Sequence, residues 1–222
     1  MNDHDSFPIL SRQNPVKNSV ACLFYFDTKQ DQIMGNAGTA TLFRYANSIY
    51  AFTCMHCLTD VGDQVYALKL RTYGYRMLYG KTVVRKLDDE DLPAKLEVAV
   101  IKLYWDSACT EEAYFDPGTI MDIDVDYRSS VELPFTCFGY PSGRGVTIRS
   151  NEYYEANDGY WEFIVSDNES FEGGFSGALF VDKQQYPYAI AYSCQENGRT
   201  HAYGIPISLA SKRAHEVLDK EM

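Results

Sequence analysis

The chain has 222 residues, of which 45% are hydrophobic and 23% are charged, and its formal net charge is −11. That length suits one large domain or two small ones, and the acidic charge argues against nucleic acids and anionic membranes as partners. No stretch is apolar enough for a transmembrane span, and the polar segment Met1–Ser6 lacks the features of a secretory signal. We therefore expect a cytoplasmic protein that binds neither nucleic acid nor membrane.

Strand-like runs dominate the chain, because β-branched and aromatic residues alternate with turn residues such as Gly35-Asn36. Regular short strands without helical patterns between them predict antiparallel barrels or sandwiches rather than a parallel sheet. The predicted strands are Val20–Phe26, Thr39–Tyr45, Ile49–Cys54, Gln64–Arg71, Tyr75–Arg85, Glu97–Leu103, Leu133–Tyr140, Val146–Tyr154, Tyr160–Ser166, Ala178–Val181, Tyr186–Cys194 and His201–Ile207.

The strands fall into two series separated by the acidic segment Ala108–Arg128, which predicts an inter-domain connection. Only the last segment of the chain has helical spacing, and Ser208 can cap it. We expect this terminal helix to pack on a barrel. The apolar residues that recur on one face of the helix are Leu209, Ala210, Ala214, Val217 and Leu218.

The cysteines are predicted to be reduced thiols, since most of them lie in apolar strand-like runs where cysteine behaves as a small hydrophobe. Cys54 and Cys57 have CxxC spacing, but a zinc site would need a second pair of ligands and a haem attachment would need a histidine after Cys57. We therefore expect no metal ion and no cofactor. The six cysteines are Cys22, Cys54, Cys57, Cys109, Cys137 and Cys194.

Three segments supply the residue types of nucleophilic catalysis, in the order histidine, acid, serine. His56 ends a predicted strand, Glu97 opens another, and Ser176 lies in Gly174-Phe175-Ser176-Gly177. A serine hydroxyl is a weak nucleophile until an imidazole takes its proton, and an acid fixes the tautomer of the imidazole. Glycines beside the serine let backbone N–H groups point at a developing oxyanion. The pattern therefore predicts a serine nucleophile activated by a histidine.

With these motifs the chain resembles a trypsin-like serine peptidase of the chymotrypsin fold over residues 18–222. The resemblance is stronger to compact bacterial members, including the HtrA-like peptidase domain, than to animal digestive enzymes. It implies an all-β fold of two six-stranded antiparallel β-barrels with a C-terminal α-helix. The residues that carry it are Gly38–Leu42, His56-Cys57, Glu97–Lys102, Gly174–Gly177 and Tyr203–Ile207.

On this resemblance the chain divides into five parts. An N-terminal extension covers 1–17, and an N-terminal barrel with His56 and Glu97 covers 18–107. A linker covers 108–130, a C-terminal barrel with Ser176 covers 131–207, and the helix covers 208–222.

The resemblance also implies a role for each site residue. Ser176 is the nucleophile, His56 the general base and then acid, and Glu97 the acid that orients the histidine. The backbone N–H groups of Gly174 and Ser176 form the oxyanion hole. Phe175 stands where animal members carry an aspartate that pairs with a newly cut N-terminus, which excludes that route of activation.

Some of these assignments have alternatives. Most members of the family use aspartate where this chain has Glu97, so Asp91 and Asp89 on the preceding segment stay open as the acid. His4, His201 and His215 are the weaker candidates for the base.

The specificity pocket is assigned by the same resemblance to Ser170, Tyr192 and His201. The pocket floor falls at Ser170, six residues before the nucleophile, where members that cleave after basic residues have an aspartate. An arginine or lysine of the substrate would then lose its ion pair while still being desolvated. We expect an apolar residue before the scissile bond, or secondly an acidic one. Inward-turned Glu169 or Glu172 would instead favour a basic one.

Together these features predict an intracellular serine endopeptidase that acts on protein or peptide substrates. A free peptidase in the cytosol is a hazard, so we expect narrow specificity or activation by a partner protein. Small stand-alone members of this kind resemble effectors of bacterial antiviral defence systems. The alternative from another class is a pseudoprotease that binds a peptide or acts as a scaffold without cleavage.

Overall fold

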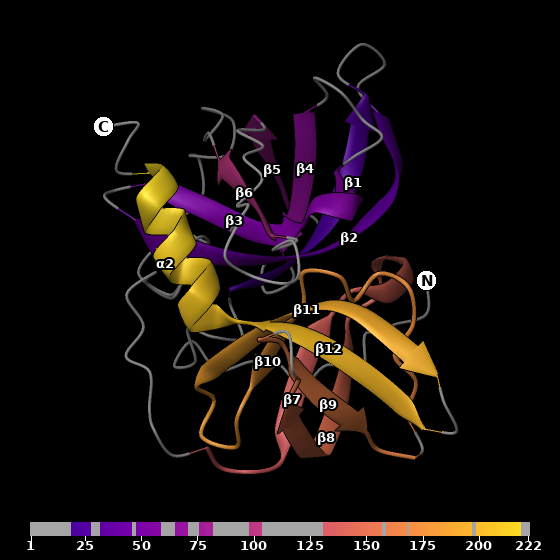
Figure 1. Cartoon of the computed structure of the whole chain (residues 1–222). Coiled ribbons are helices and arrows are strands. Elements are labelled where there is room, and N and C mark those ends of the chain that lie inside the picture. The colour runs from indigo at the N-terminus through magenta and orange to yellow at the C-terminus, as the bar shows by residue number, and fades with distance from the viewer. Residues whose placement is uncertain are drawn as a thin grey trace.

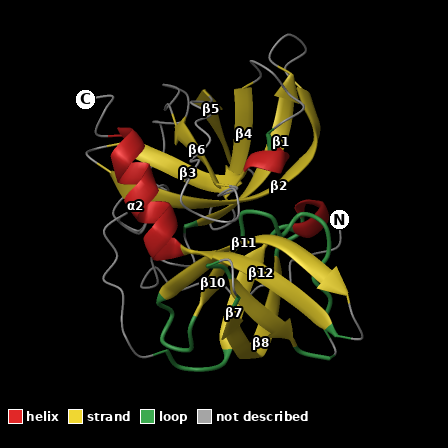
Figure 2. Cartoon of the chain, in the orientation of Figure 1, coloured by secondary structure: helices red, strands yellow, loops and turns green. Residues whose placement is uncertain are grey.

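The computed structural model describes residues 19–27, 32–45, 48–58, 65–70, 76–81, 98–103, 131–156, 159–167, 169–196 and 199–218. The described residues are mostly strand, and one α-helix follows the last strand near the C-terminus (Figure 2). In this part of the chain no helix has the length and hydropathy needed to span a membrane.

The first six strands form a closed antiparallel barrel in the order β1-β2-β3-β6-β5-β4, which the pairing of β4 with β1 completes. Buried side chains from alternate positions of these strands fill its interior, among them Leu23, Leu42 and Ile101. The strands are β1 (Val20–Asp27), β2 (Gln32–Tyr45), β3 (Ser48–Cys54), β4 (Val65–Leu70), β5 (Arg76–Lys81) and β6 (Val98–Leu103).

The other six strands form a C-terminal sheet in the order β10-β11-β12-β9-β8-β7, and the pairing of β7 with β10 closes this sheet as well. Stacked phenylalanines fill it, with the rings of Phe163 and Phe180 only 3.9 Å apart. The strands are β7 (Phe135–Gly139), β8 (Val146–Glu155), β9 (Trp161–Val165), β10 (Leu179–Val181), β11 (Pro187–Glu196) and β12 (Thr200–Pro206).

The helix α2 (Ile207–Leu218) follows β12 directly and lies along one side of the molecule, beside both sets of strands (Figure 1). Its buried residues Ala210 and Ala214 belong to a core cluster shared by the two halves. That cluster includes Phe43 and Phe52 from the barrel and Ile205 from the C-terminal sheet. Burial of this apolar surface holds the two halves together.

The predicted all-β chain with a C-terminal helix is confirmed, and each predicted strand overlaps an observed one. The predicted turn at Gly35-Asn36 is wrong, because both residues lie inside β2, where two register shifts against β1 accommodate them. Ser208 is not the residue that precedes the helix, since α2 begins at Ile207. The predicted N-terminal extension and linker lie outside the described residues.

Hydrogen bonds also join the two halves, and they converge on Thr39 of β2. The Thr39 N–H donates to the Ser176 carbonyl oxygen at 2.9 Å, and its hydroxyl donates to the Gly174 carbonyl oxygen at 2.7 Å. The same hydroxyl accepts from the Tyr140 N–H at 2.8 Å. Two residues on, the Thr41 hydroxyl donates to the Gly177 carbonyl oxygen at 2.9 Å. One strand of the barrel thus fixes the backbone of the serine turn.

Gly177 is where the fit between the halves is tightest. Its φ is +88°, and a Cβ there would lie 2.0 Å from the Thr39 carbonyl oxygen. Gly159 has nearly the same φ, +83°, but a Cβ there would meet nothing within 4 Å. Alanine substitutions at Gly177 and Gly159 therefore separate the free-energy cost of a left-handed backbone from the free-energy cost of the clash.

We expect Gly159→Ala to lower the free energy of unfolding by about 1 kcal/mol, the cost of a left-handed alanine. Gly177→Ala should lower it by about 3 kcal/mol or more, because the strand β2 must also move. Urea unfolding of the two variants measures both values. Equal losses would contradict the close approach of β2 to the serine turn.

Candidate active site

The turn that carries Ser176 has a backbone that only glycine allows at two positions. Gly174 has a φ of +105°, and a Cβ there would lie 2.8 Å from the Pro141 Cα. Phe175 lies between Gly174 and Gly177 and is buried. A Cβ at Gly139 would lie 2.4 Å from its ring. The Ala178 N–H donates to the Phe175 carbonyl oxygen at 2.7 Å and closes the turn. Ser176 is therefore presented by a rigid turn.

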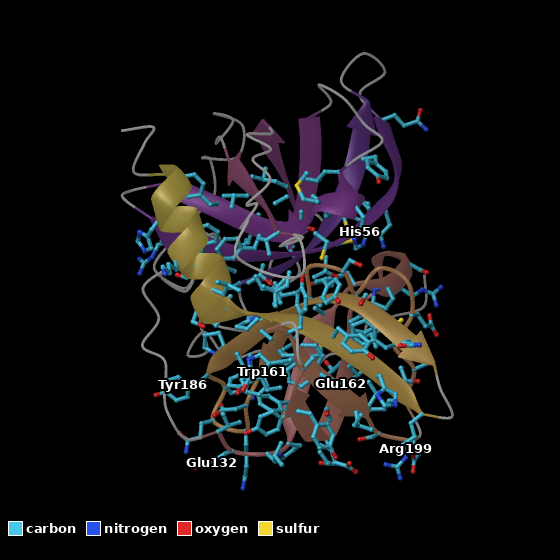
Figure 3. The ribbon with its side chains drawn as sticks, in the orientation of Figure 1. His56, Glu132, Trp161, Glu162, Tyr186 and Arg199 are labelled. Carbon is cyan, nitrogen blue, oxygen red and sulfur yellow. The ribbon has the colours of Figure 1, made fainter. Side chains whose placement is uncertain are left out.

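His56 and Ser176 meet across the junction between the barrel and the C-terminal sheet. His56 lies in the short helix η1 (Met55–Cys57), which follows β3 directly, and Figure 3 shows it at this junction. Its Nε2 is 2.8 Å from Ser176 Oγ, a hydrogen-bond distance. The Tyr192 carbonyl oxygen also lies 3.5 Å from Ser176 Oγ. The serine hydroxyl thus faces an imidazole that can accept its proton.

The backbone around Ser176 leaves two N–H groups for a ligand. Within the described part of the chain, neither the Gly174 N–H nor the Ser176 N–H donates a hydrogen bond. Their carbonyl oxygens, in contrast, both accept hydrogen bonds from Thr39. The carbonyl oxygen that shares a peptide with the Ser176 N–H is that of Phe175, and it accepts from the Ala178 N–H at 2.7 Å. This contact holds that peptide in place, and backbone N–H groups fixed in this way can stabilise a negative oxygen.

Glu97, Asp91 and Asp89, the three predicted candidates for the acid that orients His56, all lie outside the described residues. The structure does fix where β6 begins. Val98 pairs with Cys54, two residues before His56, so the start of β6 lies beside the end of β3 that leads to the histidine. Of the other candidate bases, His201 is held by Glu162, and His215 belongs to α2.

The three predicted specificity residues lie in different surroundings. Tyr192 contacts the nucleophile through its carbonyl oxygen, and its ring lies 4.7 Å from that of Tyr160. Ser170 is exposed, and its hydroxyl donates to Glu172 at 3.1 Å. His201 donates from Nδ1 to the Glu162 carboxylate at 2.5 Å, and each of these side chains is 25% exposed.

Cys57 follows His56 in the chain and is buried. A hydrogen bond with the Cys54 side chain outweighs the effect of burial and, with the neighbouring His56 and Thr53, lowers the pKa of the Cys57 thiol to about 5. A thiolate beside His56 stabilises the positive charge that the imidazole takes up when it accepts a proton. The five described cysteines form no disulfide with one another.

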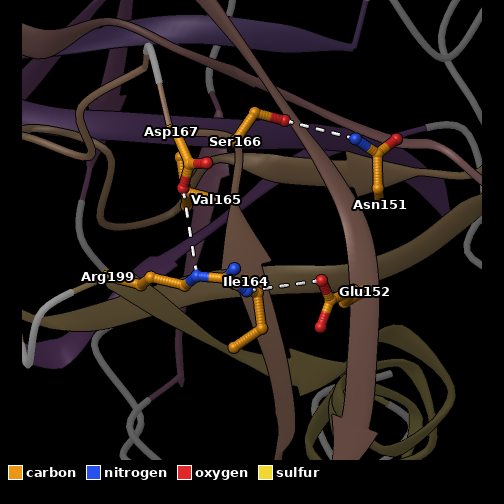
Figure 4. Close-up of a pocket in the computed structure, with 7 residues that line it drawn as sticks. All are labelled: Asn151, Glu152, Ile164, Val165, Ser166, Asp167 and Arg199. Atoms are coloured by element: carbon orange, nitrogen blue, oxygen red, sulfur yellow. Dashed lines mark hydrogen bonds and ion pairs between the residues drawn. The ribbon is translucent and has the colours of Figure 1, made fainter.

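A surface pocket of about 250 Å³ lies apart from Ser176 and His56, on the C-terminal sheet (Figure 4). Arg199 spans it, with its guanidinium 3.5 Å from Glu152 and 3.9 Å from Asp167. All three side chains are about half exposed or more, so these ion pairs contribute little to stability. The lining residues are Asn151, Glu152, Ile164, Val165, Ser166, Asp167 and Arg199.

Thr39 and Thr41 support the serine turn from the other half of the molecule, and neither was predicted from the sequence. Thr39 and Thr41 are fully buried hydroxyl residues at alternate positions of an apolar strand. Such residues need hydrogen-bond partners, and that requirement is the signal that could have marked them. No comparable sequence pattern marked Glu162, whose carboxylate binds His201.

No protein-family model and no curated protein sequence matches this chain. Solved structures do match it. The MamO protease domain from Magnetospirillum magneticum has a TM-score of 0.60 at 12% identity, and the match covers 89% of this chain and 96% of that one. The chain has the chymotrypsin fold.

Two further serine-protease structures agree. Rv3671c from M. tuberculosis, solved as an inactive serine mutant, has a TM-score of 0.62 at 10% identity, over 98% of this chain and 94% of that one. The thermostable serine protease AL20, from an extremophilic microorganism, has a TM-score of 0.60 at 14% identity, over 90% and 96%. At these identities the likeness establishes the fold, and the function must be argued from the site.

We expect the Cys57 thiol to titrate near pH 5 in the folded protein and near its ordinary 9.0 in the unfolded chain. The folded pKa is the lower one, so this group stabilises the fold fully above the unfolded pKa. That stability is lost as the pH falls through the folded value. The thiolate ultraviolet absorbance of the protein minus that of Cys57→Ala, followed from acid to alkaline pH, measures the step. A single step near 9 would contradict the assignment.

Proposed function

We propose that the protein is a serine endopeptidase that cleaves peptide bonds through an acyl-enzyme on Ser176. The observation that supports it most strongly is the 2.8 Å distance between His56 Nε2 and Ser176 Oγ, two atoms from residues 120 positions apart in the chain. A serine in a glycine turn is common, and so is a histidine at a strand end. Their meeting at hydrogen-bond distance, in a turn with the Gly174 and Ser176 N–H groups, is the arrangement that acyl transfer needs.

The chemistry follows from these contacts. Ser176 Oγ attacks the carbonyl carbon of the scissile bond while His56 Nε2 takes the hydroxyl proton. The carbonyl oxygen becomes an oxyanion, which the Gly174 and Ser176 N–H groups stabilise. The C–N bond then breaks, His56 returns its proton to the leaving amine, and the acyl group stays on Ser176. His56 next takes a proton from a water molecule, whose oxygen attacks the carbonyl carbon of this ester. The bond to Ser176 Oγ then breaks, His56 returns the proton to Oγ, and the second product leaves.

The position of the acid and the biological setting stay predictions from the sequence. Glu97 immediately precedes β6, whose first residue pairs with Cys54 next to the histidine helix, and this position supports it over Asp91 and Asp89. We assign the closed C-terminal sheet as the second barrel of the chymotrypsin fold. A cytoplasmic location, activation by a partner protein and a role in antiviral defence also stay predictions.

We expect Ser176→Ala to abolish cleavage of a mixed peptide library while the protein stays folded. Loss of a triad serine lowers turnover about 10⁶-fold, whereas removal of the hydroxyl of a half-buried serine changes stability little. Mass spectrometry of the digested library measures cleavage, and circular dichroism checks the fold. Equal cleavage by the protein and the variant would show that Ser176 is not the nucleophile, and no cleavage by either would favour the peptide-binding pseudoprotease.

We expect Glu97→Gln to lower turnover about 10³- to 10⁴-fold, because the amide no longer holds the imidazole in the tautomer that accepts the serine proton. Asp91→Asn is the matched control and should keep most of the activity. Steady-state turnover on one cleaved peptide measures both variants. The reverse pattern would move the acid to Asp91.

A further inference from the structure

The geometry of the proposed attack decides which surfaces the substrate side chain meets. The reacting carbonyl carbon must lie about 3 to 3.5 Å from Ser176 Oγ, with its oxygen at the N–H groups of Gly174 and Ser176. His56 occupies one side of the hydroxyl. The resemblance to trypsin-like peptidases implies that the side chain of the residue that supplies the carbonyl lies between the segment before Ser176 and the part of β11 that follows Tyr192. The Tyr192 carbonyl oxygen, 3.5 Å from the hydroxyl, agrees with that position.

These two surfaces are joined in this protein. The Cys194 thiol of β11 donates a hydrogen bond to the carbonyl oxygen of Phe171, at 3.4 Å. This contact spans the space between β11 and the segment that leads into Ser176. A substrate side chain that entered between them would have to break the contact or stop above it.

Phe171, whose carbonyl oxygen accepts this hydrogen bond, belongs to a closely packed part of the C-terminal sheet. The Phe171 side chain is 5% exposed, and its ring stacks on that of Phe175 at 4.5 Å. Both rings belong to the core cluster of the C-terminal sheet, together with Ala191 of β11 and Ala202 of β12. A close-packed interior of this kind has no room for a substrate side chain.

We propose that the bridge from Cys194 to Phe171 closes the primary specificity pocket, so that the protein cleaves after small residues, namely alanine, serine and glycine. This inference rests on the proposed peptidase function and names its substrate class. It narrows the apolar preference expected from the sequence to the smallest apolar side chains.

The charged alternatives are disfavoured by contacts of the neighbouring acids. An acidic substrate side chain that reached His201 would also meet the carboxylate of Glu162, which already holds that ring. A basic side chain would need a free inward carboxylate. Glu172 accepts from the exposed Ser170, and Glu169 accepts from the backbone N–H of Arg149.

The test compares peptides that differ only in the residue before the scissile bond: alanine, leucine, phenylalanine, arginine or glutamate. We expect the kcat/KM of the protein for alanine to exceed that for leucine or phenylalanine about 100-fold, as expected where a pocket cannot admit added methylenes. Cys194→Ala removes the bridge from an exposed position, so it should raise kcat/KM for leucine at least about 10-fold and leave alanine nearly unchanged. Gln195→Ala, the next residue on β11, is the control and should change neither.

Each outcome decides a different part of the proposal. A protein that cleaves best after leucine, phenylalanine, arginine or glutamate overturns the closed pocket, and so does a Cys194→Ala variant with an unchanged profile. Modification of Ser176 by a fluorophosphonate does not depend on the pocket. It therefore tests the proposed peptidase function separately from the closed pocket. An unmodified Ser176 with no cleavage refutes the peptidase function and this inference with it. A modified Ser176 with a large-residue profile refutes the closed pocket alone.

Discussion

Thr39 makes four hydrogen bonds, three of which join the two halves of this molecule in the register on which the site depends. Its N–H and hydroxyl bind the carbonyl oxygens of Ser176 and Gly174, while its hydroxyl and carbonyl oxygen accept from Tyr140 and Thr53. Buried hydrogen bonds of this kind contribute only about 0.5 to 1.5 kcal/mol each, but an unsatisfied buried group costs more. The network therefore fixes geometry more than it adds stability.

These hydrogen bonds also orient the backbone of the serine turn. Thr39 of β2 binds the carbonyl oxygens of Gly174 and Ser176, and the Ala178 N–H binds that of Phe175, so the backbone of the serine turn has a fixed orientation. Glycine at positions 174 and 177 is what allows this backbone, because both have positive φ and both meet other atoms closely. The same barrel delivers His56 from the end of β3, the strand whose Thr53 hydroxyl donates to Thr39. Contacts among β2, β3 and the serine turn thus place both Ser176 and His56.

The strands and the positions of Ser176 and His56 could be predicted from the sequence, because each depends on a local pattern of residues. Alternating apolar runs located the strands, and the glycine turn and the strand-end histidine located Ser176 and His56. Contacts between distant segments could not be predicted in the same way. The hydrogen bond from Thr39 to Gly174 joins residues 135 positions apart, and the pair of His201 with Glu162 joins neighbouring strands whose register depends on the whole sheet. The error at Gly35-Asn36 has a similar cause, since bulges in β2 accommodate residues that usually mark a turn.

The central claim is that Ser176 is a nucleophile activated by His56, and trapping the acyl-enzyme tests it most directly. The protein would be mixed with an activated ester of N-acetylalanine and quenched in acid, and its peptides would be mapped by mass spectrometry. The structure predicts an acetylalanyl group on the peptide that contains Ser176, at a yield that falls sharply in His56→Ala. No adduct, or an adduct on Cys194 in place of Ser176, would contradict it.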